Sequence, residues 1–248
     1  MVASGPVTRS TLRQQIADAL RDEVLAGRLQ PGQEFTVKQI ADQYGVSATP
    51  VREALVDLSA QGLLDSDQHK GFRVHQFTVA DYRGMVEARA LIVDGLYRRL
   101  TERGMACGIH APEGVGGGPG AGAPAGPRCP RDGALTSVLR RAEAAARAAR
   151  AGDLDILIGY DLRFWREMCG LVANRYVADF LHRLRVQAWV FAVPYLRGDR
   201  RLCDWLWSGH VELVDAVSEG VPERVMAVID AYNAHALRWA DHLDGAGR

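Results

Sequence analysis

A proline inside a helix-like stretch constrains the fold of this chain more than any other single residue. Residues 45–55, GVSATPVREAL, alternate apolar and charged side chains at helical spacing around Pro50. A proline in a helix interior costs about 3 kcal/mol, because it removes an N–H donor and its ring clashes with the preceding turn. In the first turn the cost is small, since the N–H groups there have no intrahelical partner. The stretch therefore predicts a helix from about Ser47 to Gln61, capped by the hydroxyl of Ser47 or Thr49.

Two further helical segments precede this helix, and a hairpin pattern follows it. The segment STLRQQIADALRDEVLAGRL ends at Gly27 and carries apolar residues at four-residue spacing: Leu12, Ile16, Leu20 and Val24. The segment FTVKQIADQYG predicts a short helix capped by Thr36 and ended by Gly45. The short apolar runs 63–64 and 72–74, separated by a polar turn, predict a hairpin. This order of elements predicts a winged helix-turn-helix over residues 1–76.

The placement of charge, and not its sum, favours DNA as the partner of this domain. The chain has 30 basic and 30 acidic residues, so its net charge is zero. Its only two lysines are Lys38, at the start of the middle helix, and Lys70, at the hairpin tip. Arg52 lies in the first turns of the third helix, which in this fold enters the major groove. There it can contact guanine through two hydrogen bonds, or contact a phosphate.

The residues just described resemble a known family. PGQEFTVKQIADQYGVSATPVREALVDLSAQGLL and HKGFRV are similar to the N-terminal domain of GntR-family bacterial transcription regulators, and the helical remainder is similar to their FadR/FCD branch. The resemblance implies a DNA-binding transcription regulator and not an enzyme. It implies DNA contacts from Lys38, Ser47, Ala48, Thr49, Pro50, Arg52, His69, Lys70 and Gly71. Ala48 stands where many relatives have arginine, so we expect specificity to depend more on Arg52 and the wing.

We expect a homodimer that binds a palindromic site on double-stranded DNA, because two-fold symmetry doubles the contacts of one domain. The N-terminus MVASGPVTRS lacks the order of a signal peptide, and no run of about 18 apolar residues occurs. We therefore expect a cytoplasmic protein with no membrane partner and with reduced cysteines.

Helical periodicity continues through the second predicted domain, residues 77–248, so the expected fold class is mostly α. Thr78 and Asp81 have capping-box spacing, and the expected inward face of the first helix consists of Met85, Ala88, Leu91 and Ile92. Residues 104–132 are dominated by glycine, proline and alanine, and we expect them to form a flexible insertion because they bury little apolar surface. The remaining segments predict an all-α bundle of the FCD type.

The resemblance also implies a polar site inside this bundle. In metal-binding FCD proteins, three histidines and one aspartate from different helices hold a divalent ion. Asp161 and His210 match two of these positions, whereas Trp165 and Tyr232 stand in place of two histidines. We therefore expect no tightly bound metal and no other cofactor. We expect the two rings to fill the place of the ion, and Asp161 and His210 to hydrogen-bond each other, the tyrosine hydroxyl or a ligand.

Several interpretations of this site stay open. A small organic acid or an acyl-type effector would pack on the rings, with Arg89 pairing with its carboxylate. Alternatively, Arg89 pairs with Asp161 or another acid of the protein, and the bundle serves only for dimerisation. His235, one turn beyond Tyr232, could instead complete a three-ligand metal site with Asp161 and His210. An enzyme is disfavoured, since the sequence offers neither a glycine-rich phosphate loop nor a complete nucleophile and base.

Overall fold

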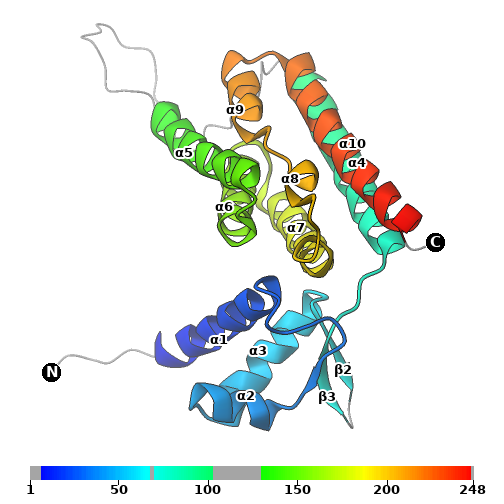
Figure 1. Cartoon of the computed structure of the whole chain (residues 1–248). Coiled ribbons are helices and arrows are strands. Elements are labelled where there is room, and N and C mark those ends of the chain that lie inside the picture. The colour runs from blue at the N-terminus through cyan, green and yellow to red at the C-terminus, as the bar shows by residue number, and fades with distance from the viewer. Residues whose placement is uncertain (1–6, 68–69, 103–129, 247–248) are drawn as a thin grey trace, which may run out of the picture. The chain divides into compact units, whose positions relative to one another are not determined.

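The computed structural model describes residues 7–67, 70–102 and 130–246, drawn as ribbons in Figure 1. His69 and most of the expected insertion, including Cys107 and Cys129, lie outside these ranges. Residues 130–132 of that expected insertion are helical, because α5 already begins at Pro130. The chain forms two compact units, Met1–Tyr82 with Arg185–Arg200, and Arg83–Leu184 with Arg201–Arg248. None of the described helices is long and apolar enough to cross a membrane.

Three helices form the core of the first unit: α1 (Val7–Leu25), α2 (Val37–Tyr44) and α3 (Ala48–Ala60). Both α1 and α2 pack on α3. The apolar residues at helical spacing are buried as predicted: Ile16, Leu20, Val24, Val51, Ala54, Leu55 and Leu58. Leu12, in the first half of α1, is only half-buried. The third helix thus has one face in the core and leaves the other face to solvent.

The helix boundaries follow the local signals in the sequence, with one exception. Thr36 forms a capping box with Gln39, and Gly45 ends α2 in the left-handed conformation. Ser47 occupies the N-cap of α3, but its side chain makes no capping hydrogen bond. Thr49 lies inside the first turn, where it is no longer at the cap position. The predicted hydroxyl cap of α3 is therefore wrong, and its first N–H groups have no side-chain cap.

A small antiparallel sheet completes this unit, with strand order β1-β3-β2. The predicted hairpin is formed by β2 (Leu64–Asp67) and β3 (Gly71–Val74), with Leu64 opposite Val74. Strand β1 (Glu34–Phe35), which pairs with the other edge of β3, was not predicted from the sequence. Two residues are too few to show the alternation by which a strand is recognised. The N-terminal unit is a winged helix-turn-helix.

Gly71, at the start of β3, can be tested by a single substitution. Its φ is +99°, and an added Cβ would lie 2.7 Å from the carbonyl oxygen of Phe35. We expect Gly71→Ala to lower the free energy of unfolding in urea by about 2 kcal/mol, because both the backbone angle and the contact are unfavourable. Gly84→Ala is the matched control, since a Cβ there meets nothing within 4 Å. Equal stability of the two variants would contradict this account of the wing.

The second unit is built from α4 (Val79–Glu102), α5 (Pro130–Ala151), α6 (Leu154–Val172), α7 (Arg175–Leu196), α8 (Leu202–Trp205), α9 (His210–Glu219) and α10 (Pro222–Ala246). The first residues of α4 and the second half of α7 belong to the first unit. Helix α5 packs on α6 and α9, and α9 packs on α10. Among the described residues, this unit contains no strand. The predicted all-α fold of the second domain is confirmed.

Helix α4 begins at the predicted capping box and lies along α10 (Figure 1). The amide of Thr78 donates to Asp81 at 2.7 Å, and the amide of Asp81 donates to the Thr78 hydroxyl at 3.1 Å. Hydrogen bonds from Thr78 hold the pKa of Asp81 below its ordinary value. Met85 is buried as predicted, but Leu91 is 65% exposed. A helix turns about 100° per residue, which places Leu91 well outside the stripe that Met85 begins.

Candidate nucleic-acid interface and ligand site

The N-terminal end of α3 exposes short polar side chains together with one arginine. Ser47, Ala48, Thr49 and Arg52 are exposed, while Val51 between them is fully buried. Among the described residues, Arg52 has no ion-pair partner, so its guanidinium is available to an external acceptor. Together with the uncapped N–H groups of the first turn, this end of α3 is suited to phosphates and base edges.

Two other parts of the first unit carry the remaining expected DNA contacts. Lys38, the second residue of α2, is exposed. Lys70, also exposed, lies in the turn between β2 and β3, where its amide donates to the carboxylate of Asp67 at 3.1 Å. Gly71 begins β3, and Pro50 lies in the first turn of α3. These residues come from the elements that a winged helix-turn-helix presents to DNA.

Asp65, a carboxylate in the wing, forms an ion pair with Arg73 on the neighbouring strand. Asp65 accepts hydrogen bonds from Arg73 at 3.2 Å and from His75 at 2.7 Å. Burial raises the pKa of Asp65, but these two hydrogen bonds outweigh it and hold the pKa below its ordinary value. Arg73 is thus paired within the sheet, and Lys70 is the wing cation that points to solvent.

The polar site of the second unit is centred on one carboxylate oxygen. Asp161 on α6 and His210 on α9 are 4% and 1% exposed. The Nε2 of His210 and the Nε1 of Trp165 each lie 3.0 Å from Oδ1 of Asp161. The predicted hydrogen bond between Asp161 and His210 is confirmed. Trp165, which stands where the resemblance implies a histidine ligand, donates its only N–H to the same oxygen and offers no lone pair to a metal.

Aromatic rings pack around this pair. The ring of Tyr232 lies 5.3 Å from Trp165 and 4.7 Å from Trp207, between ring centroids. Trp207 in turn lies 4.5 Å from His210. These separations are those of aromatic pairs in contact, which stabilise a core beyond the area that they bury. Trp207, which was not predicted to belong to the site, thus contacts both His210 and Tyr232.

Arg89 reaches the site from α4, and its two described hydrogen bonds go to side chains of α10. Its Nε donates to Oδ1 of Asn233 at 2.8 Å, and its NH1 donates to the hydroxyl of Tyr232 at 2.9 Å. The predicted pairing with Asp161 or another acid is not what these bonds show, because both acceptors are neutral. Asn233, which is 9% exposed, was not predicted from the sequence to belong to the site. A buried amide in the apolar face of α10 is the signal that could have identified it.

His235 does not join Asp161 and His210. Its Nε2 faces the backbone carbonyl of Asp204 at 3.3 Å. Burial lowers the pKa of His235, against the opposing effect of this hydrogen bond. Within the described ranges, no group of three or more His, Cys, Asp or Glu side chains is arranged to hold a metal ion. The three-ligand alternative therefore has no support in this geometry.

One ring nitrogen of His210 makes no hydrogen bond to the described residues. Nε2 of His210 is engaged by Asp161, which leaves Nδ1 as the second polar atom of the ring. This Nδ1 is buried without a hydrogen-bond partner. An unsatisfied buried polar atom costs about 1–3 kcal/mol. A bound group that formed a hydrogen bond with this nitrogen would remove that cost.

A winged helix-turn-helix joined to a helical domain with a buried polar site defines a class of proteins, the DNA-binding transcription regulators. Residues 12–74 match the family described as "Bacterial regulatory proteins, gntR family", and residues 127–235 match the FCD domain. The chain belongs to the gntR family and carries an FCD domain; it is a transcription regulator and not an enzyme.

Relatives that are similar in sequence are named as transcriptional regulators. The "Probable D-xylose utilization operon transcriptional repressor" of Paenarthrobacter nicotinovorans is 27% identical over 96% of this chain and 93% of its own length. The "HTH-type transcriptional regulator McbR" of Escherichia coli K12 is 34% identical, over 30% of this chain and 34% of its own.

Solved structures show the same fold. E. coli McbR/YncC has a TM-score of 0.70 at 17% identity, covering 98% of this chain and 99% of that chain. A putative GntR regulator from Rhodococcus sp. RHA1 has a TM-score of 0.64 at 18% identity, covering 95% and 99%.

Proposed function

We propose that this protein represses transcription by binding a palindromic operator as a homodimer, and that a small organic ligand in the second unit modulates this binding. The observation that carries the proposal is the end of α3, where Arg52 and the uncapped first turn are exposed beside a buried Val51. The Paenarthrobacter relative, named as a repressor over nearly the whole length of both chains, supports the direction of regulation.

In this proposal, the base contacts come from Arg52 and its neighbours on α3: Ser47, Ala48, Thr49 and Pro50. Lys38, His69, Lys70 and Gly71 contact the backbone or the adjacent groove. One such helix reads only a few base pairs, whereas a two-fold dimer reads two half-sites about one helical turn apart. Homodimerisation therefore follows from the specificity that an operator requires.

The proposed ligand is an organic molecule with an acidic group. Its apolar part would pack on Trp165 and Tyr232, and a hydroxyl or amide would donate to Nδ1 of His210. A carboxylate is a stronger acceptor for the Arg89 guanidinium than the Tyr232 hydroxyl that it now contacts. The ligand would thus form a hydrogen bond with His210, which is itself bonded to Asp161, and its carboxylate would form an ion pair with Arg89.

Selection of binding sites from random duplex DNA, followed by footprinting, tests the DNA part of the proposal. We expect a selected site with two inverted half-sites, and a sedimentation mass of two chains. A single unrepeated half-site bound by one chain would refute the homodimer.

A thermal-shift screen of short organic acids and acyl thioesters tests the ligand part. A ligand that binds only the folded protein raises the midpoint of unfolding. The competing function is a ligand-independent regulator whose bundle serves only for dimerisation. That function would be supported if no compound shifted the midpoint and if Arg89→Ala left DNA binding unchanged.

We also expect the purified protein to retain no stoichiometric transition metal after dialysis against a weak chelator. Trp165 and Tyr232 supply no imidazole, and Asp161 with His210 leaves most of a tetrahedral shell unfilled. Elemental analysis measures this directly. Near-stoichiometric zinc, nickel or manganese that disappears in Asp161→Asn and His235→Ala would establish the metal-dependent alternative through Asp161, His210 and His235.

A further inference from the structure

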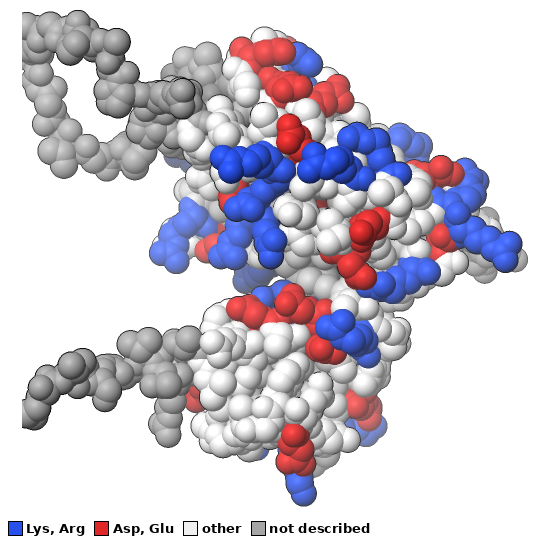
Figure 2. Space-filling view, turned by 60° about the vertical axis from the view of Figure 1, so that its left-hand side comes forward, with Lys and Arg blue, Asp and Glu red and all other residues white. Residues whose placement is uncertain are grey.

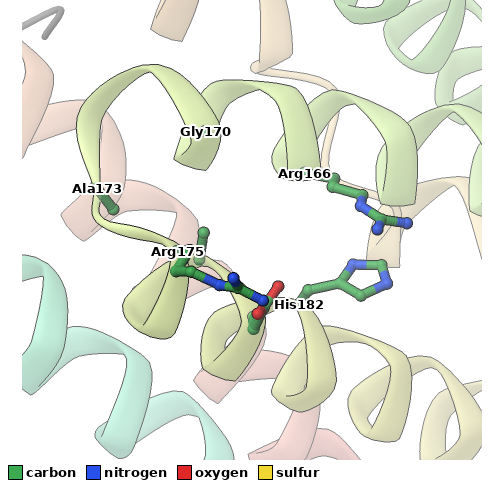
Figure 3. A pocket seen from close by; sticks show the side chains of 7 residues that line it. Arg166, Gly170, Ala173, Arg175 and His182 are labelled. Atoms are coloured by element: carbon green, nitrogen blue, oxygen red, sulfur yellow. The ribbon is translucent and has the colours of Figure 1, made fainter. Parts of the chain in front are cut away.

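The second unit has a hollow of about 280 Å³ where the end of α6 meets the start of α7. Its lining includes Arg166, Gly170, Arg175, Ala178, Asp179 and His182. Figure 3 shows the guanidinium group of Arg166, from α6, beside the ring of His182, from α7, and Arg175 extending along α7 on the other side of that ring. None of these residues belongs to the proposed ligand site around Asp161, although Arg166 directly follows Trp165 on α6.

Glu167, the acid next to Arg166 in sequence, does not neutralise the positive charge of this hollow. Glu167 is adjacent to Arg166 in sequence, but its carboxylate is engaged by Arg141 at 2.5 Å and by the Ser137 hydroxyl at 3.2 Å. The hydrogen bond from Arg141 holds the pKa of Glu167 below its ordinary value. Glu167 thus remains ionised and paired with Arg141, and does not compensate Arg166.

Within the part of the chain that the structure describes, neither Arg166 nor Arg175 takes part in an ion pair. Asp179 is the acid in the lining, so two guanidinium groups face one carboxylate. On the face seen in Figure 2, basic side chains lie beside acidic ones. Within the lining itself, two guanidinium groups against one carboxylate give a net positive charge.

We propose that this hollow binds the phosphate group of a small molecule. A guanidinium presents two parallel N–H donors that match two oxygens of a phosphate, and two such groups against one carboxylate leave a net positive charge that favours an anion. His182 supplies a further ring N–H, and Asp179 accepts from a hydroxyl of the attached molecule. The volume is just below the range of pockets for drug-sized ligands, which suits a phosphate on a short carrier.

Titration calorimetry with inorganic phosphate, at constant ionic strength kept by chloride, tests this proposal on the full chain. We expect saturable binding that Arg166→Ala and Arg175→Ala each weaken about tenfold or more, because each removes a charge-assisted pair of hydrogen bonds. Arg163→Ala is the matched control: Arg163 is exposed on the same helix, one turn before Arg166, and does not line the hollow. Its affinity for phosphate should equal that of the natural chain.

Both arginines are exposed, so the variants should fold, and their circular dichroism and melting curves establish this before titration. Absence of saturation at millimolar phosphate would overturn the proposal, as would equal weakening in all three variants. Loss of non-specific DNA binding in Arg166→Ala and Arg175→Ala, with phosphate affinity unchanged, would assign the two arginines to DNA and also overturn it.

Discussion

Replacement of Arg52 by alanine should weaken binding to the selected operator by about 1–3 kcal/mol, which is about 5- to 150-fold. Arg52 is exposed near the N-terminal end of α3, and the apolar residues beside it hold the helix in the core. The substitution therefore removes a contact to the DNA without removing a contact that stabilises the fold. Discrimination between operators that differ at one base pair should fall together with affinity, since a guanidinium reads guanine through two hydrogen bonds.

Lys70→Ala is the control for this prediction, because a lysine at the wing tip contacts phosphate as a point charge. It should lower the dependence of affinity on salt by about one unit of slope and leave base preference unchanged. Electrophoretic mobility shifts at several salt concentrations, with the operator and single-base variants, measure both effects. A footprint that survives Arg52→Ala unchanged in strength and sequence preference would show that α3 is not the recognition helix.

Replacement of Asp161 by alanine should lower the free energy of unfolding by about 3–5 kcal/mol. The carboxylate is 4% exposed and accepts from both Trp165 and His210 through a single oxygen. Its removal leaves two buried N–H donors without an acceptor and opens a cavity among the rings. Asp161→Asn should cost less, since an amide oxygen still accepts, although without charge.

Urea denaturation measures this loss, and Asp215→Ala is its control. Asp215 is exposed on α9, the helix that also carries His210, so its replacement should change stability by less than about 0.5 kcal/mol. If Asp161→Ala and Asp215→Ala had similar small effects, the hydrogen bonds to Asp161 would not stabilise the bundle. In that case the proposed ligand site would lose the fixed imidazole on which it depends.

The elements of the first unit could be predicted from sequence because each is marked by a local signal. Thr36 and Gly45 bound α2, and Pro50 fixes where α3 begins. Strand β1 could not be predicted, since its two residues become a strand only when β3 lies beside them. The prediction that Leu91 faces inward was wrong, because the turn of about 100° per residue places Leu91 well outside the stripe that Met85 begins.

Of the ligand site, only the pair Asp161 and His210 could be predicted, because both residues match positions of the metal-binding FCD pattern. Asp161 and His210 were identified as a pair, and they do share a hydrogen bond. The partners of Arg89 depend on which faces of α4 and α10 meet, which is a property of tertiary packing. Tyr232 and Asn233 are adjacent on α10, and both accept a hydrogen bond from the Arg89 guanidinium on α4.

The strict division of α3 into two faces has a consequence for how regulators of this kind diverge. Val51, Ala54, Leu55 and Leu58 are at most 1% exposed, whereas Ala48, Thr49 and Arg52 project into solvent. Substitutions on the solvent face leave the core untouched, and such changes usually alter stability by less than about 0.5 kcal/mol. After gene duplication, a copy can therefore acquire a new operator through one or two mutations at these positions, without first accumulating compensating changes in its core.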